Sequence, residues 1–110
     1  MLVNFSFSFC DNTGNNISSL QVEMPVMPTR KGQYVCLENL DDPDVPDTFI
    51  SSFAYAFNKS KIAVDNIGRI DNRGPITNYK ASVLSALDNM IWRITDIYYT
   101  PAGLTINLEY

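Results

Sequence analysis

The feature that most constrains the fold is the alternation of apolar and polar residues in the last twenty positions. In LTINLEY (104–110) every second residue is apolar, and IWRITDIYY (91–99) is rich in β-branched and aromatic residues. The segment TPAG (100–103) between them is typical of a turn. Side chains of a strand point alternately to opposite faces, so the pattern predicts a C-terminal hairpin with one buried face. We expect these residues to form a central part of the core: Trp92, Ile94, Leu104, Ile106 and Leu108.

The N-terminal end of the chain shows the same alternation. Residues 2–9 are predicted to form a strand whose inner face carries Val3, Phe5, Phe7 and Phe9. The polar residues 11–19 are typical of a turn, and the alternating residues 17–24 predict a second strand that pairs with the first. A third strand is predicted at 33–38, after a turn at Arg30-Lys31-Gly32.

The middle of the chain changes to helical spacing. The segment DDPDVPD (41–47) combines acids with prolines and predicts a loop, with Asp47 as the cap of a helix over 48–58. Residues 59–75 read mainly as turns, with an alternative short strand at 61–64. A second helix follows, capped by Thr77 or Asn78. The two predicted apolar stripes consist of Phe49, Ile50, Phe53, Ala54 and Phe57, and of Tyr79, Val83, Leu84, Leu87 and Ile91.

Runs of strands around a helical middle are typical of an α+β fold, because parallel sheets need alternating strands and helices. We therefore predict one α+β domain over residues 1–110. It has about five mostly antiparallel strands in the order βββ-α-α-ββ, with two helices packed on one face of the sheet. The length fits one domain with a substantial core, and the hydrophobic fraction of 45% excludes a disordered chain.

Several kinds of chemistry find no support in the sequence. The chain has no histidine, the commonest general base and metal ligand, and it contains neither a GxGxxG nor a GxxxxGK[ST] phosphate-binding loop. We therefore expect no enzymatic activity and no cofactor. The net charge of −4 disfavours direct nucleic-acid binding, which needs a basic surplus. Arg69 and Arg73 could contact phosphate, but no aromatic residue lies between them, so ordinary surface charge is the preferred interpretation.

The remaining candidates are residues that could contact a protein partner. Tyr98 and Tyr99 fall on opposite faces of the predicted strand, so one of them is expected to point outward, where tyrosine often contributes to interfaces. Met27 and Pro28 lie in an apolar irregular segment that either binds a partner or covers the core. The acidic loop offers a third surface, which is either solvated, binds calcium or meets a basic partner. Its candidate residues are Asp41, Asp42 and Asp44.

One combination of motifs resembles a known group of proteins. Pro25-x-x-Pro28-x-x-x-Gly32-x-x-Val35-x-Leu37 precedes a strand, and Trp92-x-Ile94-x-x-Ile97-x-Tyr99 leads to a turn and Leu104-x-Ile106-x-Leu108-Glu109. This resembles small β-rich proteins of bacteriophages and other mobile elements, some of which form SH3-like barrels near head–tail joints. The resemblance implies a structural or accessory virion protein that acts by protein contacts, and an SH3-like barrel with a helical insertion as the alternative fold.

Two functions are therefore expected from the sequence. The first is a non-enzymatic protein–protein interaction module that binds a protein partner or itself, and that is phage-encoded and virion-associated. The alternative is a small acidic anti-defence inhibitor, similar to anti-CRISPR proteins, that binds a host nuclease or effector through the acidic loop. The chain has neither a run of 18 apolar residues nor a basic leader, so we expect no membrane span and a location in the host cytoplasm or the virion.

Overall fold

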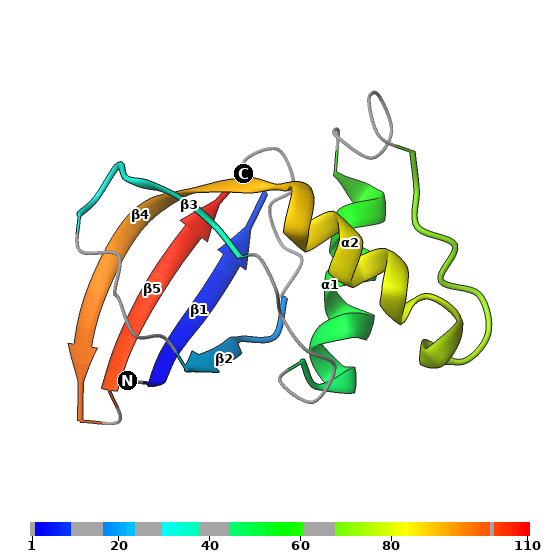
Figure 1. Ribbon diagram of the computed structural model, residues 1–110, viewed down its shortest axis with the longest axis horizontal. Helices are drawn as coiled ribbons and strands as arrows, with labels where there is room; N and C mark the ends of the chain where they lie inside the picture. Colours follow the sequence, from blue (N-terminus) through cyan, green and yellow to red (C-terminus); the bar gives the residue numbers. More distant parts are fainter. Residues whose placement is uncertain (1, 10–16, 24–29, 38–44, 61–67, 102) are drawn as a thin grey trace.

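A computed structural model describes residues 2–9, 17–23, 30–37, 45–60, 68–101 and 103–110 of the chain (Figure 1). Its strands and helices are β1 (Leu2–Ser8), β2 (Leu20–Glu23), β3 (Tyr34–Cys36), α1 (Asp47–Lys59), the short 3₁₀ helix η3 (Ile76–Asn78), α2 (Lys80–Asn89), β4 (Ile91–Thr100) and β5 (Gly103–Glu109). The predicted α+β class, with five strands and two α-helices, is confirmed. The five strands form one sheet in the order β2-β1-β5-β4-β3.

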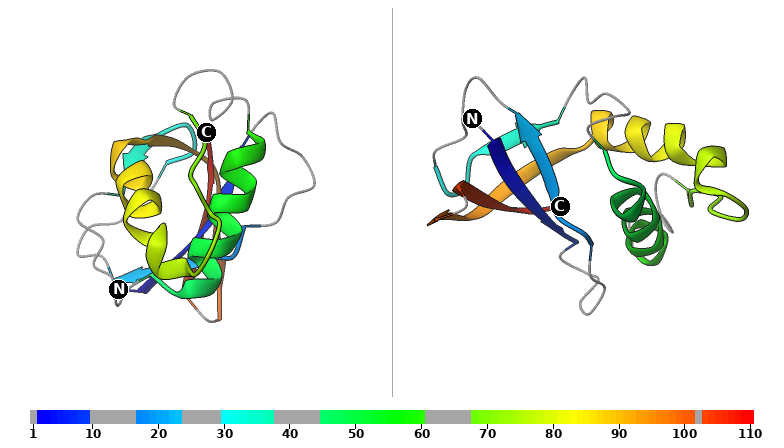
Figure 2. Two further views of the ribbon diagram at one scale, coloured as in Figure 1. Left: turned by 90° about the vertical axis from the view of Figure 1, so that its right-hand side faces the viewer. Right: turned by 90° about the horizontal axis from the view of Figure 1, so that it is seen from below.

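The pairing within the sheet is mixed. Both predicted hairpins are present, because β1 pairs antiparallel with β2 and β4 pairs antiparallel with β5. The two hairpins meet through a parallel pairing of β1 with β5, in which Val3 is in register with Leu104 and Phe7 with Leu108. β3 then adds antiparallel to the far side of β4. The sheet is curled (Figures 1 and 2), and among the described residues no pairing between β2 and β3 closes it into a barrel.

A β-bulge interrupts the alternation of β4. Ile94 is opposite Leu108 in β5, whereas Asp96 is opposite Asn107, so Thr95 is one extra residue in this strand. The hydroxyl of Thr95 donates a hydrogen bond of 3.3 Å to the Asn107 carbonyl oxygen. Before the bulge, the even-numbered residues of β4 point to the inner face of the sheet, and beyond it the odd-numbered residues do. Ile97 is therefore paired with the buried Ile106.

The core lies between the inner face of the sheet and α1, which contributes the predicted apolar stripe. The Phe7 ring centroid lies 5.3 Å from that of Phe49 and 5.0 Å from that of Trp92. Phe53 packs against Phe9 at a centroid distance of 6.0 Å. Both helices lie at one end of the curled sheet (Figures 1 and 2), and these aromatic contacts attach α1 to it. The residues predicted for the C-terminal hairpin core are all buried: Trp92, Ile94, Leu104, Ile106 and Leu108.

Three local predictions about the helices were wrong. Asp47 is the first residue of α1 rather than its cap. The cap position is occupied by Pro46, whose backbone is extended and whose side chain has no oxygen to accept a hydrogen bond. Thr77 and Asn78 do not cap α2 but form η3 with Ile76. Ile91 leaves the helical stripe, because α2 ends before it and the strand turns its side chain outward, with 59% exposed. The alternative short strand at 61–64 lies outside the described residues.

Candidate functional site

The two tyrosines predicted for partner contact lie near the tip of the β4–β5 hairpin. Tyr99 is 86% exposed and Tyr98 is 49% exposed, so both rings reach solvent rather than one of them. Leu2 of β1, which is 47% exposed, lies at the same end of the sheet, since its neighbour Val3 is in register with Leu104. Leu2 and Tyr98 lie on the outer face of the sheet and Tyr99 on the inner face, and we call these three exposed side chains at the end of the sheet the tyrosine surface.

The exposure of Tyr99 follows from the pairing of β4. Tyr99 is in register with Leu104, which is only 4% exposed, so its ring lies on the inner side of the sheet. β3 reaches only the first part of β4, where Val35 is opposite Trp92. Among the described residues, the second part of β4 therefore has a strand on one side only, and its other side is a sheet edge. The ring of Tyr99 lies beside this edge and remains in solvent.

The other partner-contact residues predicted from the sequence are not placed by the structure. Met27 and Pro28 lie outside the described residues, as do Asp41, Asp42 and Asp44. In the described part of the chain, no three Asp, Glu or Cys side chains gather in a metal-binding arrangement. No helix found there is both long and apolar enough to cross a membrane.

A second candidate site surrounds the extended segment that runs from Gly68 to Arg73. The side chain of Asn58 in α1 fixes this segment with two hydrogen bonds. Its carbonyl oxygen accepts a 2.7 Å bond from the Ile70 amide, and its amide nitrogen donates a 2.8 Å bond to the Ile70 carbonyl oxygen. Ile70 is buried at 8% exposure, whereas Arg69 and Asp71 on either side are exposed. One side of this segment is therefore apolar, and its other side is charged.

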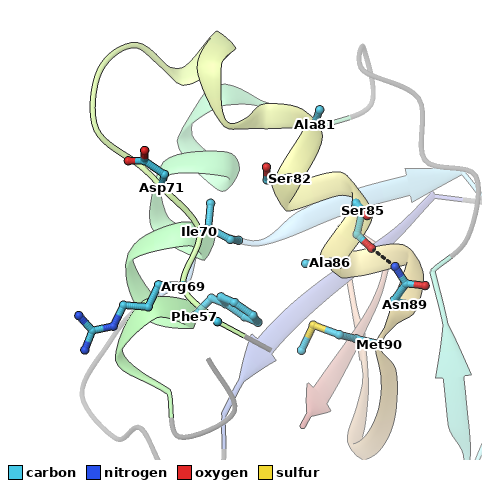
Figure 3. A pocket seen from close by; sticks show the side chains of 11 residues that line it. Phe57, Arg69, Ile70, Asp71, Ala81, Ser82, Ser85, Ala86, Asn89 and Met90 are labelled. Carbon is cyan, nitrogen blue, oxygen red and sulfur yellow. Dashed lines mark hydrogen bonds between the residues drawn. The ribbon is translucent and has the colours of Figure 1, made fainter. Parts of the chain in front are cut away.

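The apolar side borders a pocket of about 490 Å³ between the segment and α2 (Figure 3). Phe57, Ile70 and Met90 form its apolar wall, and Asn89 donates a hydrogen bond of 2.8 Å to the Ser85 carbonyl oxygen at its rim. Arg69 and Asp71 also line the pocket, and their side chains point away from α2 in this view. The pocket therefore has an apolar wall, with the neutral polar side chain of Asn89 at its edge.

The charged side borders a second hollow, of about 610 Å³. We call it the basic hollow; it is lined by Tyr55, Asn58, Lys59, Arg69, Ile70, Asp71, Asn72 and Arg73. Arg73 forms two parallel contacts with Asp71, from Nε to Oδ1 at 3.0 Å and from Nη2 to Oδ2 at 3.1 Å. These hydrogen bonds hold the pKa of Asp71 below its ordinary value and raise that of Arg73. Asp71 therefore stays ionised, and the lining of the hollow contains this one carboxylate and three cations.

The sequence pointed to Arg69 and Arg73 but missed the residues that complete their surroundings. Tyr55 and Lys59 come from α1, and the Lys59 ammonium nitrogen lies 4.5 Å from the centroid of the Tyr55 ring. The spacing of four residues on a helix predicts that these two side chains meet. Arg69 lies ten residues after Lys59, and no local pattern in the sequence indicates that its segment returns to this face of α1. The return depends on the two hydrogen bonds of the Asn58 side chain to Ile70.

Comparison with known proteins finds no matching family model, no similar curated protein and no matching solved structure. The function must therefore be argued from the two surfaces themselves. The tyrosine surface offers aromatic area beside a sheet edge, and the basic hollow offers cations beside an aromatic ring.

Proposed function

We propose that this protein is a non-enzymatic protein–protein interaction module that docks its partner on the tyrosine surface. The observation that carries the proposal is the 86% exposure of Tyr99, on a strand whose paired residue Leu104 is buried. Tyrosine loses little conformational entropy on binding and combines a large contact area with a polar tip, so tyrosines are enriched among residues that dominate interface energies.

The sheet edge beside Tyr99 supports the same function. An edge strand presents unpaired backbone N–H and C=O groups, to which an extended segment of a partner can add as a further strand. In that mode the backbone hydrogen bonds provide affinity, and the outward side chains select the partner. The proposed partner therefore contributes an extended segment to the second half of β4, with Tyr98 and Tyr99 packed on it.

The proposed setting is the one that the resemblance to phage proteins implies, a virion or an infected host cell. The second function expected from the sequence, inhibition of a basic host nuclease, depends on Asp41, Asp42 and Asp44. These residues lie outside the described part of the chain, so the nuclease inhibitor stays a prediction from the sequence.

Affinity capture from a lysate of the source cells, compared between variants, tests the proposal. Tyr99→Ser and Tyr98→Ser should each lower recovery of a bound protein about tenfold, as expected for central interface tyrosines. Tyr34→Ser is the matched control, since Tyr34 is also an exposed tyrosine, at 66%, but lies on β3, which pairs with the other part of β4. A partner that all three variants retain equally would contradict the proposal.

The identity of the captured protein separates the two settings. Recovery of phage structural proteins supports a virion role, whereas recovery of a basic nuclease supports the inhibitor. Size-exclusion chromatography with light scattering tests self-association through the same surface. If the protein is strictly monomeric and enters no larger assembly, the virion role is excluded.

A further inference from the structure

The basic hollow has a charge opposite to that of the whole chain. Its lining carries the cations of Lys59, Arg69 and Arg73 and the single carboxylate of Asp71, a local surplus of two positive charges. The complete chain has a net charge of −4. Surface charges more than about 10 Å away are screened at ordinary ionic strength, so an anion in the hollow experiences mainly these nearby cations.

Among the described residues, Arg73 is the only one of the three cations that has a carboxylate partner, which is Asp71. The Lys59 ammonium group lies over the Tyr55 ring, and an anion in the hollow can replace this cation–π contact because it attracts the ammonium group more strongly. A phosphate dianion would match the charge of Arg69 and Lys59, and arginine binds phosphate oxygens in a paired geometry.

Tyr55 gives the hollow an aromatic wall. Its side chain is 53% exposed, and it lines both the basic hollow and a neighbouring hollow that also contains Ile76. A ring of a ligand can therefore pack against Tyr55 while the ligand's phosphate lies against Arg69. The exposed amide of Asn72 adds a hydrogen-bonding group, and the volume of about 610 Å³ is within the range of small-molecule sites.

We propose that the basic hollow binds a small ring-bearing phosphate monoester, with the phosphate held by Arg69 and Lys59 and the ring packed on Tyr55. Asn58 acts as the positioning residue, because its two hydrogen bonds to Ile70 fix the backbone next to Arg69. This site is separate from the tyrosine surface and does not depend on the protein-binding role.

Calorimetric titration with adenosine monophosphate tests the proposal, with adenosine and inorganic phosphate titrated in parallel. We expect adenosine monophosphate to bind more tightly than either part. Arg69→Gln should weaken its binding about tenfold or more, since it removes a charge-assisted contact. Tyr55→Leu should weaken it at least about fivefold, through loss of ring stacking. Both side chains are exposed, so the melting temperatures should stay close to that of the wild type.

Arg30→Gln is the matched control. Arg30 is an exposed arginine beside another hollow, of about 480 Å³, which has Lys31 but no aromatic side chain in its lining. The turn that carries it lies at the opposite end of the molecule from α1 (Figures 1 and 2). This variant should change the affinity less than about twofold. The proposal is overturned if adenosine monophosphate does not bind, if Arg30→Gln weakens binding as much as Arg69→Gln, or if adenosine or inorganic phosphate binds equally tightly.

Discussion

Ile106 and Asn107 are neighbours in β5 with opposite surroundings. Ile106 is completely buried and in register with Phe5 on one side and Ile97 on the other. Asn107 lies on the outer face, half-buried, between Ser6 and Asp96. Burial of an isoleucine side chain removes apolar surface from water, whereas the outer face keeps its polar side chains in contact with solvent.

Ile106→Ala should therefore lower the free energy of unfolding by roughly 2–5 kcal/mol, a large part of the about 5–15 kcal/mol typical of a domain. Asn107→Ala should change it by less than about 0.5 kcal/mol. Urea denaturation of both variants measures the difference. Equal shifts, or a larger shift for Asn107→Ala, would show that the assigned faces are wrong.

Asn58 is the residue on which the second site depends. Asn58→Ala leaves both the amide and the carbonyl of the buried Ile70 without their partner, so we expect a loss of about 1–3 kcal/mol. Hydrogen exchange at the Ile70 amide should also become much faster. Asn72→Ala, which removes an exposed amide of the same hollow, should leave both measurements close to the wild type. Unchanged exchange at Ile70 in Asn58→Ala would contradict the role of this side chain.

Among the strands and helices, the sequence predicted those features that follow from the spacing of its apolar residues. Alternation identified both hairpins and the buried residues Ile94 and Ile106, and helical spacing identified the stripe of α1. The bulge at Thr95 was missed, although the inward residues change from Trp92 and Ile94 to Ile97 and Tyr99, which is the change of phase that one extra residue produces. The parallel pairing of β1 with β5 was also missed, since alternation specifies the buried face of a strand and not its neighbour.

Each candidate site likewise has residues that the sequence indicates and an arrangement that only the structure shows. Tyr98 and Tyr99 could be singled out because aromatic residues at the end of a strand are visible in the sequence. Their simultaneous exposure depends on the bulge and on the shortness of β3, and both are properties of pairing. The basic hollow joins Tyr55 to Arg69 through tertiary contacts, so the sequence could indicate only its arginines.

For the whole molecule, the parallel pairing of β1 with β5 determines how the protein responds to mechanical force. The two strands run in the same direction over six register pairs, from Val3–Leu104 to Ser8–Glu109. The beginning of β1 and the end of β5 therefore lie at opposite ends of the sheet (Figure 1). Tension between these two points slides one strand along the other and loads all of their hydrogen bonds together.

Single-molecule stretching should therefore show a higher unfolding force when the protein is pulled from the N-terminus and residue 110 than when it is pulled from the N-terminus and Pro101. Pro101 is exposed in the turn just before β5, so the second geometry pulls the two strands apart from one end and breaks their bonds in succession. Forced unfolding reports the barrier to unfolding and not the equilibrium stability. This small sheet should thus be strong against tension along its strands and weak against peeling, a directional resistance that thermal or chemical denaturation does not reveal.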